Sequence, residues 1–185
     1  MLMKRNYYNF HHTIFQEAPV CKKVVIWNFL DFGHVNFVHK RSYKYVKVLA
    51  KYGNATFAEF GVNHGLNRFF PFTLRHVMWH QFVPPDTVMH ISRTPFGTYS
   101  KVIVKIREFK RDNKVFTRIE HSFYLHLPFF LLPFKKLVKW YMEHWSALLW
   151  EEDLAMCLRR QHALDKGFKD APLETLPFVS EGLAD

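Results

Sequence analysis

The feature that most constrains the fold is a long segment near the end of the sequence that contains neither glycine nor proline. It covers residues 134–165 and reads FKKLVKWYMEHWSALLWEEDLAMCLRRQHALD. Trp145, Leu149 and Met156 mark one apolar face when the segment is drawn as a helix. We therefore predict a single long C-terminal helix, whose apolar face has to be covered by other parts of the chain.

Most of the preceding sequence has the pattern of β-strands. Segments rich in tyrosine, valine and phenylalanine are separated by residues that are typical of turns. The turns are expected at Gly53-Asn54, at Pro84-Pro85-Asp86 and at Arg111-Asp112-Asn113. The strands are expected at residues 42–52, 55–62, 76–83, 87–93, 99–110 and 115–127, with a loop at residues 63–72.

Two further elements are expected before this run of strands. Residues 7–15 can form a first strand. Residues 20–32 have a broad apolar face and predict a helix, which Gly33 would end or kink.

The order of elements is therefore strand, helix, six strands and one long helix, which predicts an α+β fold in two layers. A curved antiparallel sheet wrapped around the long helix would give a helix-grip fold with an internal hydrophobic cavity. Aromatic residues make up 18% of the chain and include twenty phenylalanines, which suits a large apolar cavity or an apolar surface. We expect one domain over residues 1–167 and a tail over residues 168–185.

The sequence DFGHVNFVHK, which begins at Asp31, contains a candidate metal site. Asp31, His34 and His39 have the spacing D-x2-H-x4-H, and His39 can join the other two only if the helix bends or ends. Two neutral imidazoles suit iron, zinc, copper or nickel, and a carboxylate would complete a facial triad. The alternative is that both histidines are solvated at a helix end and that Asp31 bonds local amides.

The long helix offers the carboxylate, in the sequence EED at residues 151–153. On a helical wheel Glu152 falls near the centre of the apolar face and Asp153 at its edge. A carboxylate at either position is costly to bury unless it is paired or bound to a metal. The wheel alone does not choose between Glu152 and Asp153.

With these residues, the sequence over about 20–167 resembles the catalytic domain of Rieske-type aromatic-ring-hydroxylating oxygenases, a helix-grip domain of the SRPBCC (START and Bet v 1-like) superfamily. In that family an aspartate and two histidines at this spacing follow the first strand, and an aspartate on the C-terminal helix is the third iron ligand. The resemblance implies that His34, His39 and Asp153 hold Fe(II). It also implies that Asp31 is the catalytic aspartate that links an iron histidine to a neighbouring subunit's Rieske centre.

The chain departs from that family in one respect. A Rieske domain holds a [2Fe–2S] cluster through two cysteines and two histidines. This sequence has two cysteines, Cys21 and Cys157, and no C-x-H or C-x2-H motif. We therefore expect no [2Fe–2S] cluster in this chain and electrons from a separate transfer protein.

The expected function is a stand-alone oxygenase-like domain that acts on a hydrophobic substrate of aromatic or isoprenoid type. One alternative is a non-catalytic protein that binds or transfers lipids or other hydrophobic ligands. Another is a metal-free cyclase-type enzyme that uses cavity histidines and aspartates as acid and base.

Three more histidines lie in the expected strands. His76 and His80 share one face of a strand, because side chains alternate along it, and His90 lies in the next strand. Each is by itself more typical of a sheet residue than of a metal ligand, but His76 and His80 are candidates for lining the cavity.

The formal net charge of +10 suits a nucleic acid, an anionic membrane or an acidic protein as partner. The sequence has no nucleic-acid-binding motif, so nucleic acid is not expected. The segment LPFFLLPFKK instead predicts a peripheral membrane contact, unless it packs into the core where the long helix begins. Its contact residues would be Phe129, Phe130, Leu131, Leu132, Lys135 and Lys136.

The expected location is the cytoplasm, at the periphery of a membrane. Two cysteines do not suggest a disulfide framework. The sequence begins without the apolar stretch of a secretory signal, and no apolar run reaches the roughly 18 residues of a spanning helix.

Overall fold

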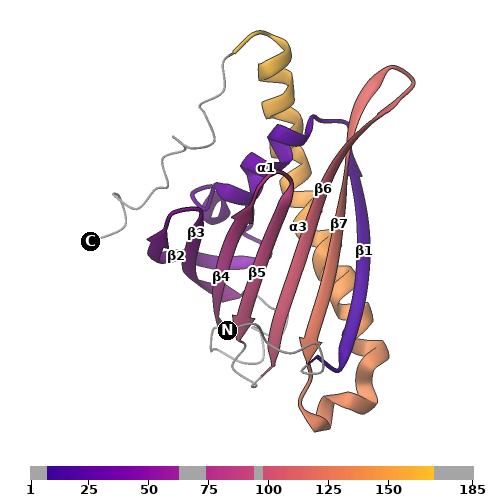
Figure 1. Ribbon diagram of the computed structural model, residues 1–185. Helices are drawn as coiled ribbons and strands as arrows, with labels where there is room; N and C mark the ends of the chain where they lie inside the picture. Colours follow the sequence, from indigo (N-terminus) through magenta and orange to yellow (C-terminus); the bar gives the residue numbers. More distant parts are fainter. Residues whose placement is uncertain (1–7, 63–73, 94–97, 169–185) are drawn as a thin grey trace.

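The computed structural model describes residues 8–62, 74–93 and 98–168. In this part of the chain a curved sheet faces one long helix (Figure 1). The helices are α1 (Lys22–Leu30), α2 (Val35–Val38), the short 3-10 helix η3 (Phe129–Phe134) and α3 (Lys135–Asp165). None of the described helices is both long and apolar enough to cross a membrane.

The sheet has seven strands, and each neighbouring pair is antiparallel. Their order is β1-β7-β6-β5-β4-β3-β2, so α1 and α2 connect the two edges of the sheet. The strands are β1 (Phe10–Ala18), β2 (Tyr43–Tyr52), β3 (Ala55–Val62), β4 (Leu74–Val83), β5 (Thr87–Arg93), β6 (Tyr99–Arg111) and β7 (Lys114–His126).

The predicted α+β helix-grip fold is confirmed, with differences at the ends of elements. The turn between β6 and β7 contains Asp112 and Asn113, both with positive φ, which matches the twist of a two-residue hairpin. The first strand begins and ends later than predicted, at Phe10–Ala18. The loop predicted at residues 63–72 lies outside the described residues, as do residues 169–185 of the tail predicted at 168–185.

The helix predicted at residues 20–32 is interrupted. α1 ends at Leu30, because Asp31 adopts an extended backbone with φ −85° and ψ 91°. The chain then turns and forms the single turn of α2, so the break comes two residues before Gly33. A continuous helix up to Phe32 was therefore the wrong prediction, and the break decides where the histidines point.

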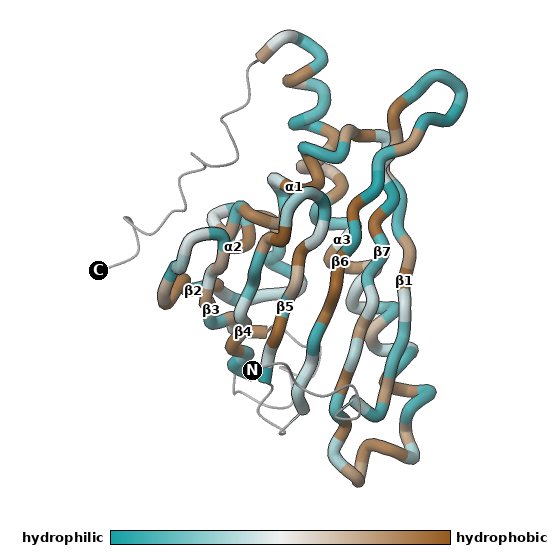
Figure 2. Tube along the Cα trace, viewed as in Figure 1, coloured by the Kyte–Doolittle hydropathy of each residue, from teal (hydrophilic) through white to brown (hydrophobic). Residues whose placement is uncertain are grey.

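The larger cluster of buried residues lies where α1 meets α3 and the neighbouring half of the sheet. Its members are fully or nearly fully buried, and burying each large apolar side chain contributes about 1.5–3 kcal/mol. They include Val24 and Val25 of α1, Val88, Val104, Ile106 and Ile119 of the sheet, and Cys157 of α3. The hydrophobic middle of β6 belongs to this core (Figure 2).

Below this core, α3 covers the sheet without filling the space between them. Of its residues only Ser146 and Cys157 are buried. A helix that packed directly on the sheet would bury a continuous stripe of side chains. The corresponding stripe of α3 instead lines a cavity, which holds the candidate site.

Candidate functional site

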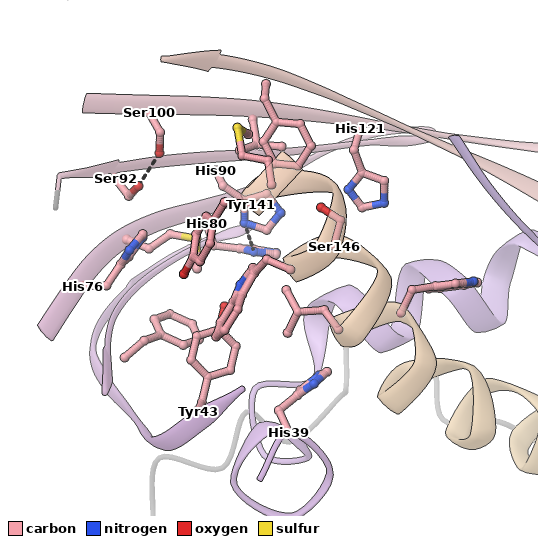
Figure 3. Close-up of a pocket in the computed structure, with 18 of the residues that line it drawn as sticks. His39, Tyr43, His76, His80, His90, Ser92, Ser100, His121, Tyr141 and Ser146 are labelled. Carbon is pink, nitrogen blue, oxygen red and sulfur yellow. Dashed lines mark hydrogen bonds between the residues drawn. The ribbon is translucent and has the colours of Figure 1, made fainter. Parts of the chain in front are cut away.

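The cavity lies between the concave face of the sheet, α3 and the segment that joins α1 to β2. It has a volume of about 660 Å³, within the usual 300–1,000 Å³ of small-molecule sites. Its walls are mostly apolar and aromatic, with polar groups at a few positions only. Figure 3 shows that its labelled polar side chains come both from the sheet and from the helices opposite it.

The cavity is elongated, with an open and a closed end. Along α3 its lining runs from Leu137 to Asp153, about 24 Å at 1.5 Å per residue. Leu137, Trp140 and Tyr141 line the cavity and are also 59%, 59% and 47% exposed, so it opens to solvent beside them. Beyond Asp153, the packing of Cys157 against α1 closes the other end.

The closed end brings together three of the predicted site residues. Asp153 Oδ1 lies 2.9 Å from His39 Nε2 and 3.3 Å from His34 Nε2. The two Nε2 atoms are 3.3 Å apart. All three side chains are largely buried, with exposed fractions of 7% for His34, 5% for His39 and 14% for Asp153. The three ligand atoms therefore form a compact triangle at the cavity wall.

This triangle has the dimensions that a metal ion requires. With bonds of about 2.0–2.2 Å, neighbouring ligands are about 3.0 Å apart at octahedral angles and about 3.4 Å at tetrahedral angles. Neither histidine contact to Asp153 has hydrogen-bond geometry, and its buried Oδ1 has no hydrogen-bond partner among the described residues. A buried carboxylate oxygen without a hydrogen bond, beside two imidazole nitrogens, fits a cation.

Glu152 orients His39 from the opposite side of the ring. His39 Nδ1 lies 3.0 Å from Glu152 Oε2. A carboxylate only accepts hydrogen bonds, so Nδ1 donates, and in the neutral ring Nε2 keeps its lone pair. The same carboxylate accepts hydrogen bonds from Ser42 Oγ at 2.7 Å and from the Arg41 backbone N–H at 3.0 Å. Glu152 is thus fully engaged beside the triangle, whereas Asp153 forms part of it.

The electrostatics of the triangle keep its carboxylate ionised. Burial would raise the pKa of Asp153, but the imidazoles of His34 and His39 outweigh it and lower that pKa to about 2. Burial would lower the pKa of His39, but the carboxylates of Asp153 and Glu152 outweigh it and raise that pKa above its ordinary value. In the absence of metal, Asp153 is therefore an anion whose charge attracts either a proton on His39 or a metal cation.

Asp31 lies next to the triangle without joining it. Its Oδ1 accepts a hydrogen bond from the Gly33 backbone N–H at 2.9 Å, which is the local bonding that its alternative interpretation predicts. Its Oδ2 is 4.0 Å from His34 Nδ1, too far for a hydrogen bond. That nitrogen is buried and unpartnered among the described residues. Asp31 is thus on the correct side of His34 to orient it, and its catalytic role stays a prediction.

The short helix α2 explains how two histidines five residues apart converge. His34 precedes its first residue and His39 follows its last. The backbone N–H of His39 donates to the Val35 carbonyl oxygen, which closes the turn. The bend required for convergence is therefore present, produced by the break at Asp31 and the single turn that follows it.

The sheet side of the cavity carries polar groups of a different kind. His76 and His80, the two candidates for cavity lining, both line it, together with His90 and His121. His80 and His90 are cross-strand neighbours whose Nδ1 atoms are 3.1 Å apart. The hydroxyls of Ser92 and Ser100 form a hydrogen-bonded pair in the next row of the sheet (Figure 3). Figure 3 also shows the His121 ring pointing toward the cavity.

These histidines are electrically neutral at physiological pH. Burial lowers the pKa of His76 and His121 to about 4 and that of His80 to about 3. Burial also lowers the pKa of His90 well below its ordinary value, and the neighbouring histidines lower it further. The alternation of side chains along one strand predicted that His76 and His80 line the cavity. It could not predict the positions of His121, Ser92 and Ser100 in the cavity, because these depend on how the strands pair.

A comparison with protein-family models finds no match, and a comparison with curated proteins finds none either. Solved structures do match. TTHA0849 from Thermus thermophilus is similar with a TM-score of 0.62 and 13% identity, over 82% of this chain and 99% of that chain. The Zhui aromatase/cyclase from Streptomyces sp. R1128 has a TM-score of 0.60 and 12% identity, over 82% and 94% of the two chains.

Dicamba monooxygenase bound to dicamba is also similar, with a TM-score of 0.60 and 14% identity. The match covers 88% of this chain and 52% of that one, so the chain spans about half the length of this monooxygenase. Identities this low show a shared fold and leave the chemistry to be argued from the site. The chain thus has the fold of proteins that include an aromatase/cyclase and a monooxygenase.

Proposed function

We propose that the chain is a mononuclear non-heme iron oxygenase-like protein that acts on a hydrophobic substrate with electrons from a separate protein. The observation that carries this proposal is the triangle of His34 Nε2, His39 Nε2 and Asp153 Oδ1 at the wall of an apolar cavity. Two imidazoles and one carboxylate are the donor set of non-heme Fe(II) oxygenases. The likeness to a monooxygenase supports iron over zinc, which the distances alone also accommodate.

Iron held by His34, His39 and Asp153 would supply the activation of dioxygen. The chain's own residues contribute in other ways. Glu152 holds the proton of His39 on Nδ1, which leaves Nε2 free to act as a ligand. The closed end excludes bulk water, and the aromatic walls hold an apolar substrate beside the triangle.

The cavity also suggests the class of substrate. Its length and apolar walls suit an elongated aromatic or isoprenoid-like molecule. The histidines and serines on the sheet are neutral, and in such surroundings a buried charge is costly. We therefore propose that the substrate carries an uncharged polar group, such as a hydroxyl or a carbonyl, which hydrogen-bonds to His90 or to the serine pair.

Electrons from a separate protein can reach the site through α2. Phe37, which lies between the two histidines in sequence, is 76% exposed, so this helix is at the protein surface. The triangle is thus one short helix away from a docking protein. An exposed phenylalanine next to Lys40 and Arg41 would suit a partner with an acidic rim around an apolar centre.

Elemental analysis of protein purified without a histidine tag, after anaerobic loading with Fe(II), tests the proposal. We expect close to one iron per chain in the wild type and none in His34→Ala. His162→Ala, which removes an exposed histidine from α3, is the matched control and should keep its iron. A folded wild-type protein that holds no iron under these conditions would refute the proposal.

Non-catalytic transport of a hydrophobic ligand is the second candidate, because the cavity is large and opens beside exposed apolar residues. A metal-free cyclase-type enzyme would use the same cavity, and the likeness to an aromatase/cyclase favours it over unrelated chemistry. The carrier predicts that His34→Ala leaves ligand binding intact, and the cyclase predicts turnover without iron and without an electron donor. The iron oxygenase predicts that this variant still binds substrate and has lost turnover.

A further inference from the structure

The mouth of the cavity carries an unusual concentration of exposed apolar side chains. Among the described residues, fourteen large hydrophobic side chains are exposed, and seven of them lie between residues 129 and 141. We call these seven the mouth patch. Phe129 is 83% exposed and Phe134 is 54% exposed, so the alternative that this segment packs into the core is wrong. Clusters of this kind mark interaction sites.

The mouth patch continues directly into the cavity. Leu137, Trp140 and Tyr141 belong to the patch and line the cavity at the same time. Apolar side chains of the first turns of α3 therefore connect the protein surface with the interior of the cavity; Figure 1 shows η3 and this part of α3 at one end of the fold. An apolar ligand that entered beside these three side chains would contact apolar surface both outside the cavity and within it.

Positive charges accompany the patch. Lys135, Lys136 and Lys139 lie within it, and the sequence has no acidic residue from 127 to 142. Lys139 has Glu143 at 3.8 Å, one turn further along α3. Lysines in the first turn of a helix oppose its dipole, so helix stability does not explain Lys135 and Lys136. Apolar side chains between lysines complement a surface that is apolar inside and anionic outside.

We propose that the mouth patch docks on an anionic lipid bilayer, from which the cavity takes up its ligand. Phe129, Phe134 and Trp140 would enter the boundary between headgroups and acyl chains, and Lys135 and Lys136 would contact anionic headgroups. The cavity mouth would then face the bilayer, and a hydrophobic molecule would pass from lipid to protein without exposure to water. This surface is about 24 Å along α3 from Asp153, so docking does not require metal.

Sedimentation with vesicles tests the proposal, with metal-free protein so that the result is independent of the iron site. We expect the wild type to bind equimolar phosphatidylcholine and phosphatidylglycerol vesicles and to bind pure phosphatidylcholine vesicles more weakly. Phe129→Asp with Phe134→Asp should reduce binding more than tenfold. Each of Lys135→Gln and Lys136→Gln should reduce binding to the anionic vesicles roughly fivefold and remove part of its salt dependence.

Phe15→Asp is the matched control, because Phe15 is 62% exposed on β1, away from the mouth. It should bind vesicles as the wild type does. The proposal is wrong if the wild type does not bind anionic vesicles, or if Phe15→Asp loses binding as strongly as the double variant. It is also wrong if the double variant converts a dimer into a monomer while the wild type ignores vesicles, since the patch would then be a subunit interface.

Discussion

The two ends of the cavity differ in which unusual side chains they carry, buried ionisable groups at one end and exposed apolar groups at the other. At the closed end, ionisable groups are buried: His34, His39 and Asp153 meet with little exposure to solvent. At the mouth, large apolar groups such as Phe129 and Trp140 are exposed. Buried ionisable groups and exposed apolar clusters are both typical of sites that bind another molecule. Our two proposals place a cation at the closed end and a lipid surface at the mouth.

Substitution of the three consecutive acids of α3 tests whether the closed end of the cavity binds iron. Asp153→Asn should abolish iron binding, because it removes a ligand. Glu152→Gln should weaken iron binding by about 10- to 100-fold, because it disturbs only the orientation and proton of His39. Glu151→Gln should have no effect, since Glu151 is 68% exposed and forms its ion pair with Arg41 at the surface. Anaerobic Fe(II) titration measures all three.

Equal losses in Glu152→Gln and Asp153→Asn would contradict the assignment of Asp153 as the ligand. A loss in Glu151→Gln would show that the overall negative charge of this segment matters more than geometry. The three residues are chemically alike. Different losses of iron binding at positions 151, 152 and 153 would therefore result from where each side chain lies.

The histidines between the two ends of the cavity should make the free energy of unfolding depend on pH. Because burial lowers the pKa of His80 to about 3, the folded protein keeps it neutral where the unfolded chain, with an ordinary pKa near 6.5, gains a proton. Its contribution to stability is complete above pH 6.5 and is lost as the pH falls toward 3. Between pH 6.5 and 5 the free energy of unfolding should fall by about 2 kcal/mol for this histidine alone.

Urea unfolding of metal-free protein at pH 7 and at pH 5 measures this effect. His80→Asn removes the titrating group and should reduce the difference between the two pH values by about the same 2 kcal/mol. His162→Ala, at an exposed position, should leave the difference unchanged. An undiminished difference in His80→Asn would show that His80 is not held neutral by the fold.

A substitution at His90 should distinguish binding by the apolar walls of the cavity from binding by the polar groups on the sheet. His90→Leu should weaken the binding of a hydroxylated aromatic probe such as 1-naphthol by about five- to tenfold, the usual worth of a hydrogen bond. Binding of naphthalene, which lacks the hydroxyl, should stay the same or become tighter. Fluorescence titration of both probes gives the ratio, and an equal change for both would contradict a polar subsite at His90.

The smallest expected effect is at the mouth. Phe129→Ser should change the free energy of unfolding by less than about 0.5 kcal/mol, because the side chain is already in water. Ile119→Ala, in the fully buried core, should cost about 2–5 kcal/mol by comparison. Thermal unfolding of both variants measures the contrast. A large loss in Phe129→Ser would mean that the mouth patch supports the fold and does not serve a partner.

The elements were largely predictable from local patterns. β3 and β5 have the predicted bounds, because turn residues flank their alternating side chains, and α3 differs by one residue because nothing within it disfavours a helix. The break at Asp31 was not predicted, since no glycine or proline stands there and the sequence placed the end of the helix at Gly33. Local sequence therefore reports the elements better than their junctions.

For the candidate site, too, the sequence indicated the segments better than the contacts between them. The spacing of His34 and His39 and the acids of α3 pointed to segments that the fold brings together, but the helical wheel left Glu152 and Asp153 equivalent. What separates them is a set of contacts with Arg41 and Ser42, more than a hundred residues away in sequence. The exposure of the mouth likewise depends on how η3 projects from the sheet, which the apolar sequence of that segment does not indicate.

Iron at the triangle in the closed end of the cavity, as we propose, would be visible in a crystal. A crystal of the protein loaded anaerobically with Fe(II), measured at the iron absorption edge, tests this proposal directly. We expect one anomalous peak about 2.0–2.2 Å from each of His34 Nε2, His39 Nε2 and Asp153 Oδ1. No peak at this position, or a peak elsewhere in the chain, would contradict it.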